Sequence, residues 1–394
     1  MSYLVAGVGG LGFFLLSVFL LGVWPGLVLE KETRLLAPQK SLPLTASEQR
    51  GRIIYAREGC AYCHTQQVRF VEADIRRFGA PTIAWETRFD YPHLWGTRRI
   101  GPDLARESGV RSADWHFAHL FSPRSVVPES VMPAYSTLFD GSADRPKQEA
   151  RDVLAYLESL GRARELAGSE AEALVKAETP DMPDMTMTSP VLNAHPARAR
   201  RMGAFPRIKL STDRERGDVI YKRHCLGCHG DKGAGDGPAA PWLSPRPTNL
   251  TEHLYSVDQL SSTLWNGVAS TAMPAWRDLS PEDLAALAFV VKSFHIPAAE
   301  PDLPADIKEL GAQVYRAKCA QCHGESGAGD GSAISELRRL PTNFQLERPS
   351  MALSLRALHN GVQGTQMAPW TEKLSEAELS AVAYYVRSLY RGRP

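Results

Sequence analysis

The sequence has almost no net charge, because 45 lysine and arginine residues are balanced by 44 aspartate and glutamate residues. A chain this balanced lacks the basic excess on which bulk binding of nucleic acid depends. It also lacks the repeated long apolar runs of a polytopic membrane protein, as its mean hydropathy of -0.25 indicates. A single membrane span remains compatible with this composition.

Charged residues are missing from one stretch near the start, residues 3–29. Its length exceeds the roughly 20 apolar residues that span a bilayer. A cleaved signal peptide would have a basic start, a shorter apolar region and a small-residue cleavage site. Here the chain begins Met-Ser-Tyr and the apolar run ends at Val28-Leu29-Glu30-Lys31. We therefore expect an uncleaved anchor over residues 1–30, although no Lys or Arg precedes it to fix its orientation.

Cysteine is scarce, and none is left over from one motif. All six cysteines lie in three copies of Cys-x-x-Cys-His: Cys60/Cys63/His64, Cys225/Cys228/His229 and Cys319/Cys322/His323. This is the attachment signature of c-type haem, in which two thiols reach the vinyl groups and the adjacent imidazole faces the iron. One copy alone could be a zinc site, a redox pair or a disulfide. Three complete copies predict three covalently bound haem c groups.

The second half of the chain is an internal repeat. Cys225 to His229 recurs 94 residues later as Cys319 to His323. Further matches share this offset: Tyr221 and Tyr315, residues 233–237 and 327–331 (Gly-Ala-Gly-Asp-Gly), 247–249 and 341–343 (Pro-Thr-Asn), and 266–268 and 360–362 (Asn-Gly-Val). A register without gaps indicates two copies of one small domain rather than a solenoid. The glycine-rich segment lacks the Lys-Ser/Thr of a phosphate loop.

Methionines are placed to complete the iron coordination. Met273 and Met367 each lie 44 residues after their histidine, and Met132 lies 68 residues after His64. Each of these methionines lies in a proline-containing loop before the last helix of its region. This placement favours a methionine that binds iron over one that packs in the core. A thioether ligand raises the potential of the iron, as electron carriers require. We predict the ligand pairs His64/Met132, His229/Met273 and His323/Met367.

Prolines between the attachment motif and the methionine are candidates for orienting the histidine. A prolyl carbonyl can accept a hydrogen bond from the ring nitrogen that does not bind iron. The candidates are Pro102, Pro247 and Pro341, and an ordinary turn proline is the alternative for each. The remaining histidines have no repeated placement. Met182, Met185 and Met187 form a cluster that thioether–copper binding could use, but a linker patch is the simpler interpretation.

The predicted fold class is mainly α, with one N-terminal transmembrane helix followed by three class I cytochrome c domains. Capping boxes predict closing helices over residues 284–294 and 379–390, and residues 150–160 form a third, with Gly161 as its stop. Prolines at 180, 183, 190 and 196 interrupt the polar segment 162–210, which predicts a linker over the surface. The domains are therefore 1–30 (anchor), 44–161, 211–298 and 305–394.

Residues 44–160 resemble the membrane-anchored monohaem subunit of cbb-type (C-family) haem-copper oxidases, FixO or CcoO. The matching residues are Gly51-Arg-Ile-Ile-Tyr55, Glu58-Gly-Cys-Ala-Tyr-Cys-His-Thr-Gln66, Trp95-Gly-Thr97, Gly101-Pro-Asp-Leu-Ala-Arg106, Asp114-Trp-His116 and Pro123-Arg-Ser-Val-Val-Pro-Glu-Ser-Val-Met-Pro133. The resemblance implies that His64 and Met132 are axial ligands. Gln67-Val68 departs from the Met-Ile expected there, and the family member normally ends soon after this domain. The two fused domains resemble small class I cytochromes c.

The resemblance implies an electron-transfer subunit of a terminal oxidase, without catalytic residues of its own. Its partners would be a polytopic catalytic subunit and a periplasmic donor, such as a soluble cytochrome c or a quinol-oxidising complex. It would be anchored in the bacterial inner membrane with its haem domains on the periplasmic side. A nitric oxide reductase subunit and a tethered electron shuttle are the alternatives. A dihaem peroxidase would need an iron with an open position, and each attachment motif here has a candidate methionine.

Overall fold

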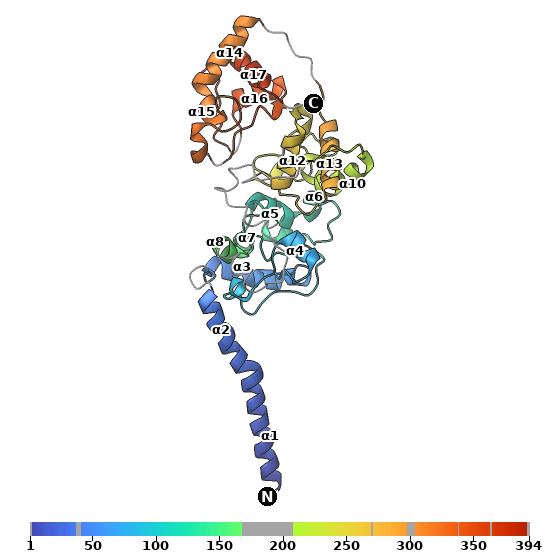
Figure 1. The fold of residues 1–394 in the computed structure, drawn as a ribbon, viewed down its shortest axis with the longest axis vertical. Helices are drawn as coiled ribbons and strands as arrows, with labels where there is room; N and C mark the ends of the chain where they lie inside the picture. Colours follow the sequence, from blue (N-terminus) through green and yellow to red (C-terminus); the bar gives the residue numbers. More distant parts are fainter. Residues whose placement is uncertain are drawn as a thin grey trace. The chain divides into compact units, whose positions relative to one another are not determined.

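The computed structural model describes residues 2–36, 41–167, 208–268, 271–297, 304–337, 339–362 and 365–391 (Figure 1). In these ranges almost all regular structure is helical, and the strands are the three-residue β1 (His253–Tyr255) and β2 (Glu347–Pro349). The predicted mainly α class is confirmed. The chain divides into two compact units, residues 1–108 with 155–192 and residues 109–154 with 193–394.

The first unit begins with an apolar helix. Figure 1 shows α1 (Ser2–Val18), the π-helical turn η1 (Phe19–Val23) and α2 (Trp24–Leu36) as one continuous helix. Pro25 has no N–H to give to the turn before it and its ring crowds the carbonyl four residues earlier, which explains the wider turn at that place. The segment Tyr3–Val28 is long and apolar enough to cross a membrane, a property that signal sequences share.

The globular part of the first unit is organised around α3 (Ala46–Arg57), which a capping box between Thr45 and Glu48 begins. Its buried Tyr55 packs edge-on against Tyr156 of α7 (Gln148–Ser159), with ring centroids 5.3 Å apart. The short elements η2 (Cys60–Tyr62), α4 (Glu72–Phe78) and η3 (Ala84–Thr87) complete it. Trp85 of η3 is fully buried, so this small core depends on aromatic side chains.

The segment after Gly161 differs from the sequence expectation. A linker was expected from residue 162, but α8 (Arg162–Ala167) begins there and packs on the first unit. Arg164 donates to Glu86 Oε1 at 3.0 Å, and Arg162 donates to Glu48 Oε1 at 2.5 Å. These buried and half-buried ion pairs hold the six residues of α8 against the domain. A helix this short shows no hydrophobic periodicity from which the sequence could predict it. The rest of the expected linker, with its methionine cluster, lies almost entirely outside the described residues.

The second unit begins with α5 (Ala113–Phe121), α6 (Pro123–Val126) and η4 (Ser136–Leu138). Each repeat then has the same order of four α-helices, whereas the short 3-10 turns differ between the two. The first contains α10 (Arg214–His224), α11 (Leu226–His229), η6 (Ala240–Trp242), η7 (Leu250–Glu252), α12 (Val257–Asn266) and α13 (Pro281–Ser293), and the second contains α14 (Ala305–Lys318), α15 (Ala320–His323), η8 (Ser332–Glu336), α16 (Met351–Asn360) and α17 (Glu376–Ser388). The closing helices α13 and α17 begin with the predicted capping boxes at Ser280 and Ser375.

The first and last helices of each repeat cross at a glycine. A Cβ on Gly217 would lie 2.4 Å from the carbonyl oxygen of Ala286, and one on Gly311 would lie 2.3 Å from that of Ala381. Such distances are impossible for a side chain, so these positions allow α10 to touch α13 and α14 to touch α17. The contact closes the apolar core of each repeat around Tyr221 or Tyr315.

The two repeats meet through an antiparallel pair of strands. Leu254 of β1 pairs with Arg348 of β2, and these two residues are equivalent in the repeat. The flanking hydrogen bonds match as well: Ser256 N donates to Leu346 O at 2.9 Å, and Ser350 N donates to Glu252 O at 2.7 Å. Each repeat therefore offers the same surface to the other, as in an isologous dimer interface.

Candidate haem sites

The three attachment motifs adopt the same tight turn. The backbone N–H of each histidine donates to the carbonyl of the first cysteine, at 3.0 Å for His64, 2.8 Å for His229 and 2.9 Å for His323. Cys225 and Met273 contact one apolar cluster, and Cys319 and Met367 contact the equivalent cluster of the second repeat. His64 lies in the first unit and Met132 in the second, so that ligand pair stays a prediction.

The second cysteine of each motif has a different environment, which three identical motifs did not predict. Its N–H donates to the carbonyl of the first cysteine, at 3.1 Å for Cys63, 3.2 Å for Cys228 and 3.1 Å for Cys322. Cys228 packs against an apolar cluster that includes Val126, because α6 covers this turn of the first repeat. Cys322 is half-buried like Cys228, but it is not among the residues of the equivalent core cluster of the second repeat. Its place in the turn is the expected one, and its bond to haem stays a prediction.

Each histidine is oriented by a backbone carbonyl. Nδ1 lies 2.9 Å from Pro102 O in His64, 3.1 Å from Thr248 O in His229 and 3.2 Å from Thr342 O in His323. A carbonyl only accepts, so Nδ1 carries the proton and Nε2 keeps the lone pair that can bind iron. Burial lowers the pKa of all three imidazoles, which favours the neutral form that a metal needs.

The prolines divide into two groups. The carbonyl of Pro102 lies where the sequence interpretation expected it. In the repeats the expected acceptor was wrong by one residue, because Thr248 and Thr342 accept in place of Pro247 and Pro341. The carbonyls of Pro247 and Pro341 instead meet the glycine-rich loop, 2.5 Å and 2.8 Å from where a Cβ on Gly235 and Gly329 would lie.

The glycine-rich loops fold back onto the attachment turn. Gly230 and Gly324 have positive φ, and a Cβ on either would lie 2.0 Å from the carboxylate of Asp236 or Asp330. Tyr221 and Tyr315 donate to the carbonyls of these same glycines at 2.7 Å. Close backbone packing behind the histidine therefore explains the motif Gly-Ala-Gly-Asp-Gly.

Each predicted methionine ligand is preceded by a hydroxyl that fixes its backbone, a feature that the sequence interpretation did not use. Two residues before the methionine, a side-chain oxygen accepts from the methionine N–H. The pairs are Ser130–Met132 at 3.2 Å, Thr271–Met273 at 3.1 Å and Thr365–Met367 at 3.1 Å. The shared Ser/Thr-x-Met spacing was visible in the sequence and could have linked the first region to the repeats.

An aromatic residue three positions after each methionine anchors the other side of the loop. Its backbone N–H donates to a leucine carbonyl at 2.8 Å in all three cases: Tyr135 to Leu120, Trp276 to Leu264 and Trp370 to Leu358. The two methionines of the repeats contact the apolar clusters that also contain Trp276 and Trp370. The three methionine loops thus share one geometry, although the first region differs in length and sequence.

The donor set fits a haem better than the other chemistries considered. Burial raises the pKa of Cys225 to about 12 and that of Cys319 to about 11, which disfavours the thiolates that zinc and redox pairs need. All six cysteines are free thiols in the structure, and within the described ranges no group of three His, Cys, Asp or Glu side chains could hold a metal ion. The indole N–H groups of Trp276 and Trp370 are buried without an acceptor, as a missing neighbour would leave them.

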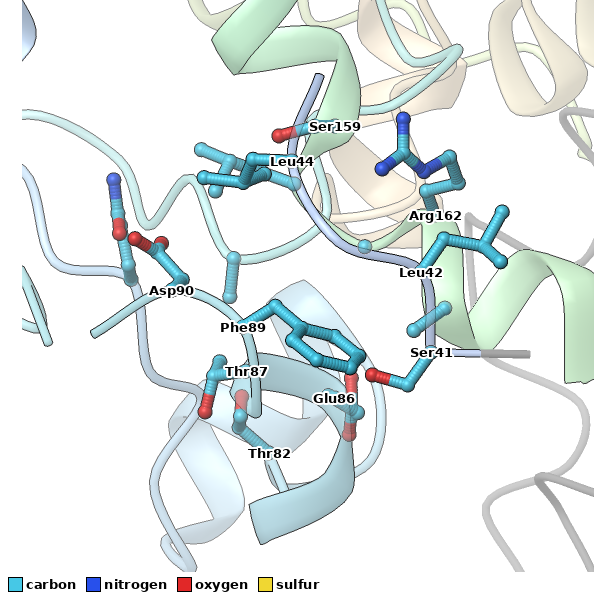
Figure 2. Close-up of a pocket in the computed structure, with 15 residues that line it drawn as sticks. Ser41, Leu42, Leu44, Thr82, Glu86, Thr87, Phe89, Asp90, Ser159 and Arg162 are labelled. Carbon is cyan, nitrogen blue, oxygen red and sulfur yellow. The ribbon is translucent and has the colours of Figure 1, made fainter. Parts of the chain in front are cut away.

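One small cavity in the first unit has a different character. Figure 2 shows it between Phe89, Ser41 and Leu42, near Glu86 and Arg162. Its volume of about 40 Å³ suits a few water molecules and is far too small for a porphyrin. Ser41 donates from its hydroxyl to the carbonyl of Trp85 at 3.0 Å, so the cavity lies where the segment after the apolar helix joins the globular part.

Comparison with known families divides the chain into three matches. Residues 13–202 match the family described as cytochrome c oxidase, mono-heme subunit/FixO. Residues 212–289 match cytochrome c oxidase, cbb3-type, subunit III, and residues 308–390 match cytochrome c. The first match begins within the apolar helix, at residue 13, and includes the first attachment motif.

Curated relatives are similar to about half of the chain. The cbb3-type cytochrome c oxidase subunit FixP of Azorhizobium caulinodans is 30% identical over 194 residues, 47% of this chain and 62% of that protein. Subunit CcoP of Azospirillum brasilense is 26% identical over 188 residues, 45% of this chain and 62% of that protein. The chain thus spans 62% of the length of these relatives.

One solved structure is similar to part of the chain, the Kuenenia stuttgartiensis reducing HAO-like protein complex Kustc0457/Kustc0458. The two chains are 26% identical over 48% of this chain and 99% of that chain, and the TM-score of 0.22 is too low to support an argument from the fold. The family matches and the donor sets agree with each other. This mainly helical chain has an N-terminal apolar helix and cytochrome c domains, and such domains bind haem c covalently.

Proposed function

We propose that the chain is a trihaem electron-transfer subunit of a cbb-type haem-copper oxidase. It passes electrons from a periplasmic donor to a separate catalytic subunit that reduces oxygen. Bound haem would supply reversible one-electron chemistry at iron. The protein contributes a neutral imidazole, a thioether and two thiols for each group, at His64/Met132, His229/Met273 and His323/Met367.

The observation that carries this proposal is the threefold recurrence of one donor arrangement in a single chain. Each copy has the same attachment turn, a carbonyl on histidine Nδ1 and a hydroxyl on the methionine N–H. A catalytic haem would need an open iron position, and a methionine candidate accompanies every attachment motif. Electron transfer therefore fits better than peroxidase chemistry.

The division of labour follows from the family matches. The monohaem match covers the first region, residues 44–161, together with the part of the apolar helix from residue 13 onward. Domains 211–298 and 305–394 would take the place of a separate dihaem subunit, since the FixP and CcoP relatives are subunits of the same class of oxidase. The chain would then combine in one polypeptide the roles of two oxidase subunits.

Contacts inside the second unit support an order of transfer from the repeats to the first domain. The strands β1 and β2 join the repeats. The attachment turn of the first repeat packs on α6, since a Cβ on Gly227 would lie 2.1 Å from Val126 O. The equivalent residue of the second repeat is the exposed Gln321. Electron transfer falls steeply with distance, so a donor would meet the second repeat and the first domain would deliver electrons onward.

The apolar helix Tyr3–Val28 would anchor the chain in the bacterial inner membrane, with the haem domains on the periplasmic side where haem c is attached. The matched families and relatives carry oxidase names, which favours oxygen over nitric oxide as the acceptor of the complex. A tethered shuttle without a catalytic partner would show the same haem domains.

The test is purification of the tagged chain from membranes in mild detergent. We expect a polytopic subunit containing b-type haem to copurify and the complex to reduce oxygen with a reduced cytochrome c. Mass spectrometry of the denatured chain should show three added haem masses. Fewer than three would remove a domain from this proposal. A chain that purifies alone, or a complex that turns over nitric oxide and not oxygen, would replace it with one of the alternatives.

A further inference from the structure

A buried carboxylate lies beside the histidine of the first attachment motif. The side chain of Asp103 is 1% exposed. Its Oδ2 accepts from Thr65 Oγ1 at 2.6 Å, from the Gln67 N–H at 3.0 Å and from Arg99 Nη2 at 3.1 Å. Its Oδ1 accepts from the Ala105 N–H at 2.9 Å. A carboxylate with this many donors is a fixed anionic centre inside the domain.

These bonds connect the two segments that meet at His64. Thr65 directly follows the histidine, and Asp103 directly follows Pro102, whose carbonyl accepts from His64 Nδ1 at 2.9 Å. Backbone bonds run alongside, from Gly101 N to Cys63 O at 2.9 Å and from Leu104 N to Thr65 O at 2.8 Å. The carboxylate and these backbone bonds together hold the ring at a fixed distance from its acceptor.

The imidazole ring of His64 is packed so closely that the neighbouring backbone has no room to move toward it. A Cβ on Gly101 would lie 2.3 Å from Cε1 of His64, so the backbone of the Pro102 segment runs directly against the imidazole. If the two segments moved apart, the Nδ1–H···O bond would lengthen and the ring could rotate. The bonds to Asp103 oppose that movement.

The repeats have no equivalent of this carboxylate. Their acceptor segments carry Asn249 and Asn343, whose side-chain oxygens accept locally, from Thr251 N at 3.1 Å and from Gln345 N at 3.0 Å. Neither of these two bonds reaches the segment that follows the histidine. The charged connection is thus particular to the first domain, the one that would deliver electrons to the catalytic subunit.

We infer that Asp103 is a positioning residue for the iron of the first domain: it fixes the His64 ring through the Pro102 carbonyl and places a negative charge beside the ligand. This inference rests on the proposed function, since it requires a haem at His64. A stronger Nδ1–H bond makes the imidazole more basic, and both this and the nearby charge favour ferric iron. The first haem therefore has a lower potential than the same ligands would otherwise give.

The chain offers a matched control for the charge. Asp74 is also a buried carboxylate of the same network, since Arg99 Nη1 donates to its Oδ1 and Arg69 donates to its Oδ2 at 2.7 Å. The hydrogen bonds of the Asp74 side chain go to Arg69 and Arg99, and none of those described here goes to residues 64–67 or 101–105. Asp74→Asn thus removes a charge from a partner of Arg99 and keeps the bonds that Thr65, Gln67 and Ala105 donate to Asp103.

The experiment compares three variants of the full-length holoprotein by potentiometric titration and by electron paramagnetic resonance of the ferric haems, whose g-values depend on the orientation of the imidazole plane. Asp103→Asn should raise one of the three midpoint potentials and shift the g-values of that same haem. Thr65→Val keeps the charge but removes the 2.6 Å bond, and should shift the same g-values by a smaller amount. Asp74→Asn should change neither.

Two results would overturn the inference. In the first, Thr65→Val binds haem and keeps the wild-type g-values, and so does Asp103→Asn if that variant folds. Asp103 would then have a purely structural role. The other is that Asp74→Asn shifts the potential as much as Asp103→Asn does, which would make the effect one of general charge. The mass of the wild-type protein tests the proposed function separately. If no haem were attached at Cys60 and Cys63, the mass would show it, and the proposed function would be wrong before the role of Asp103 was tested.

Discussion

At the scale of residues, the sequence predicts what covalent chemistry dictates and misses what backbone geometry decides. The cysteines and histidines were identifiable because haem attachment fixes their order and spacing. The carbonyl that accepts from each ring was only partly identifiable. Pro102 and Thr248 differ because the choice of acceptor depends on the local chain direction, which a proline in the segment does not determine. Asp103 belongs to a motif that carried the resemblance, but nothing in that motif indicated its role, since two of its donors, Thr65 and Gln67, come from a distant segment.

Burial is the other property that single residues do not reveal. His116 of α5 was interpreted as an ordinary histidine, and the structure shows it 5% exposed. Burial lowers its pKa to about 3, and the neighbouring charges of Arg111 and His119 act in the same direction. The folded protein therefore keeps this imidazole neutral, whereas the unfolded chain protonates it near pH 6.5.

We predict that His116 makes the protein acid-sensitive. Between pH 6.5 and about 3 the unfolded chain binds a proton that the folded chain refuses, so stability falls as the pH falls, by about 1.4 kcal/mol per pH unit at most. His116→Gln should flatten this slope, whatever its effect at pH 7. Urea unfolding of the full-length protein at about pH 7, 5.5 and 4.5 measures it. His93 is exposed, and His93→Gln serves as the control, with the pH dependence of stability expected to stay as in the wild type. If His116→Gln also left this dependence unchanged, His116 would not be its cause.

At the scale of elements, the helices with strong start signals were predictable and the short irregular ones were not. The capping boxes at Ser280 and Ser375 marked α13 and α17 to within a few residues. No comparable signal marks α8, which follows Gly161 without a gap, or the three-residue strands β1 and β2. Such short elements are fixed by tertiary contacts, here ion pairs and a cross-repeat register, which act only once the chain has folded.

The glycine that ends α16 illustrates how an element positions a ligand. Gly361 has φ +68°, and a Cβ there would lie 2.5 Å from the carbonyl oxygen of Met367. The N–H of the next residue, Val362, donates to that same carbonyl at 2.9 Å. The end of the helix therefore sets the position of the methionine loop in the second repeat.

We predict that Gly361→Ala displaces Met367. Gly361 has positive φ with ψ -172°, a region that essentially only glycine adopts, so a side chain there costs of order 1–3 kcal/mol. The contact with the carbonyl must also be relieved, so the loop should move away from the iron. The methionine-to-iron charge-transfer band of the oxidised protein should weaken by about one third if each of three haems contributes equally, and one midpoint potential should fall. Asn360→Ala, an exposed change one residue earlier, should leave both unaltered. An intact band in Gly361→Ala would argue against ligation by Met367.

At the scale of the whole molecule, the repeat predicted two equivalent domains but not how they associate. The offset of 94 residues is visible by inspection. The pairing of Leu254 with Arg348, its own repeat equivalent, is not visible, because symmetry of an interface leaves no mark on a single strand. The family matches agree with the division that the motifs suggested. The monohaem subunit family matches residues 13–202, and cytochrome families match each of the two repeats.

The proposed direction of electron flow gives the last prediction, tested by truncation. The structure corrects where the chain should be cut. Ending it at Gly161 would remove Arg164, whose guanidinium donates to Glu86 at 3.0 Å and to the Pro81 carbonyl at 3.3 Å, so the cut belongs after Ala167. The shortened chain keeps the apolar helix and the first domain, and we expect it to retain one haem and to assemble with the catalytic subunit.

Without the repeats the complex should lose fast oxidation of its natural donor, because the entry domains are gone. Small artificial reductants reach the first domain directly and should still support oxygen consumption, which separates loss of entry from loss of assembly. Stopped-flow oxidation of the donor and oxygen uptake with both reductants measure the two steps, with the full-length complex as the control. If the truncated complex oxidised its donor at the full rate, electrons would enter at the first domain, and the repeats would need another role.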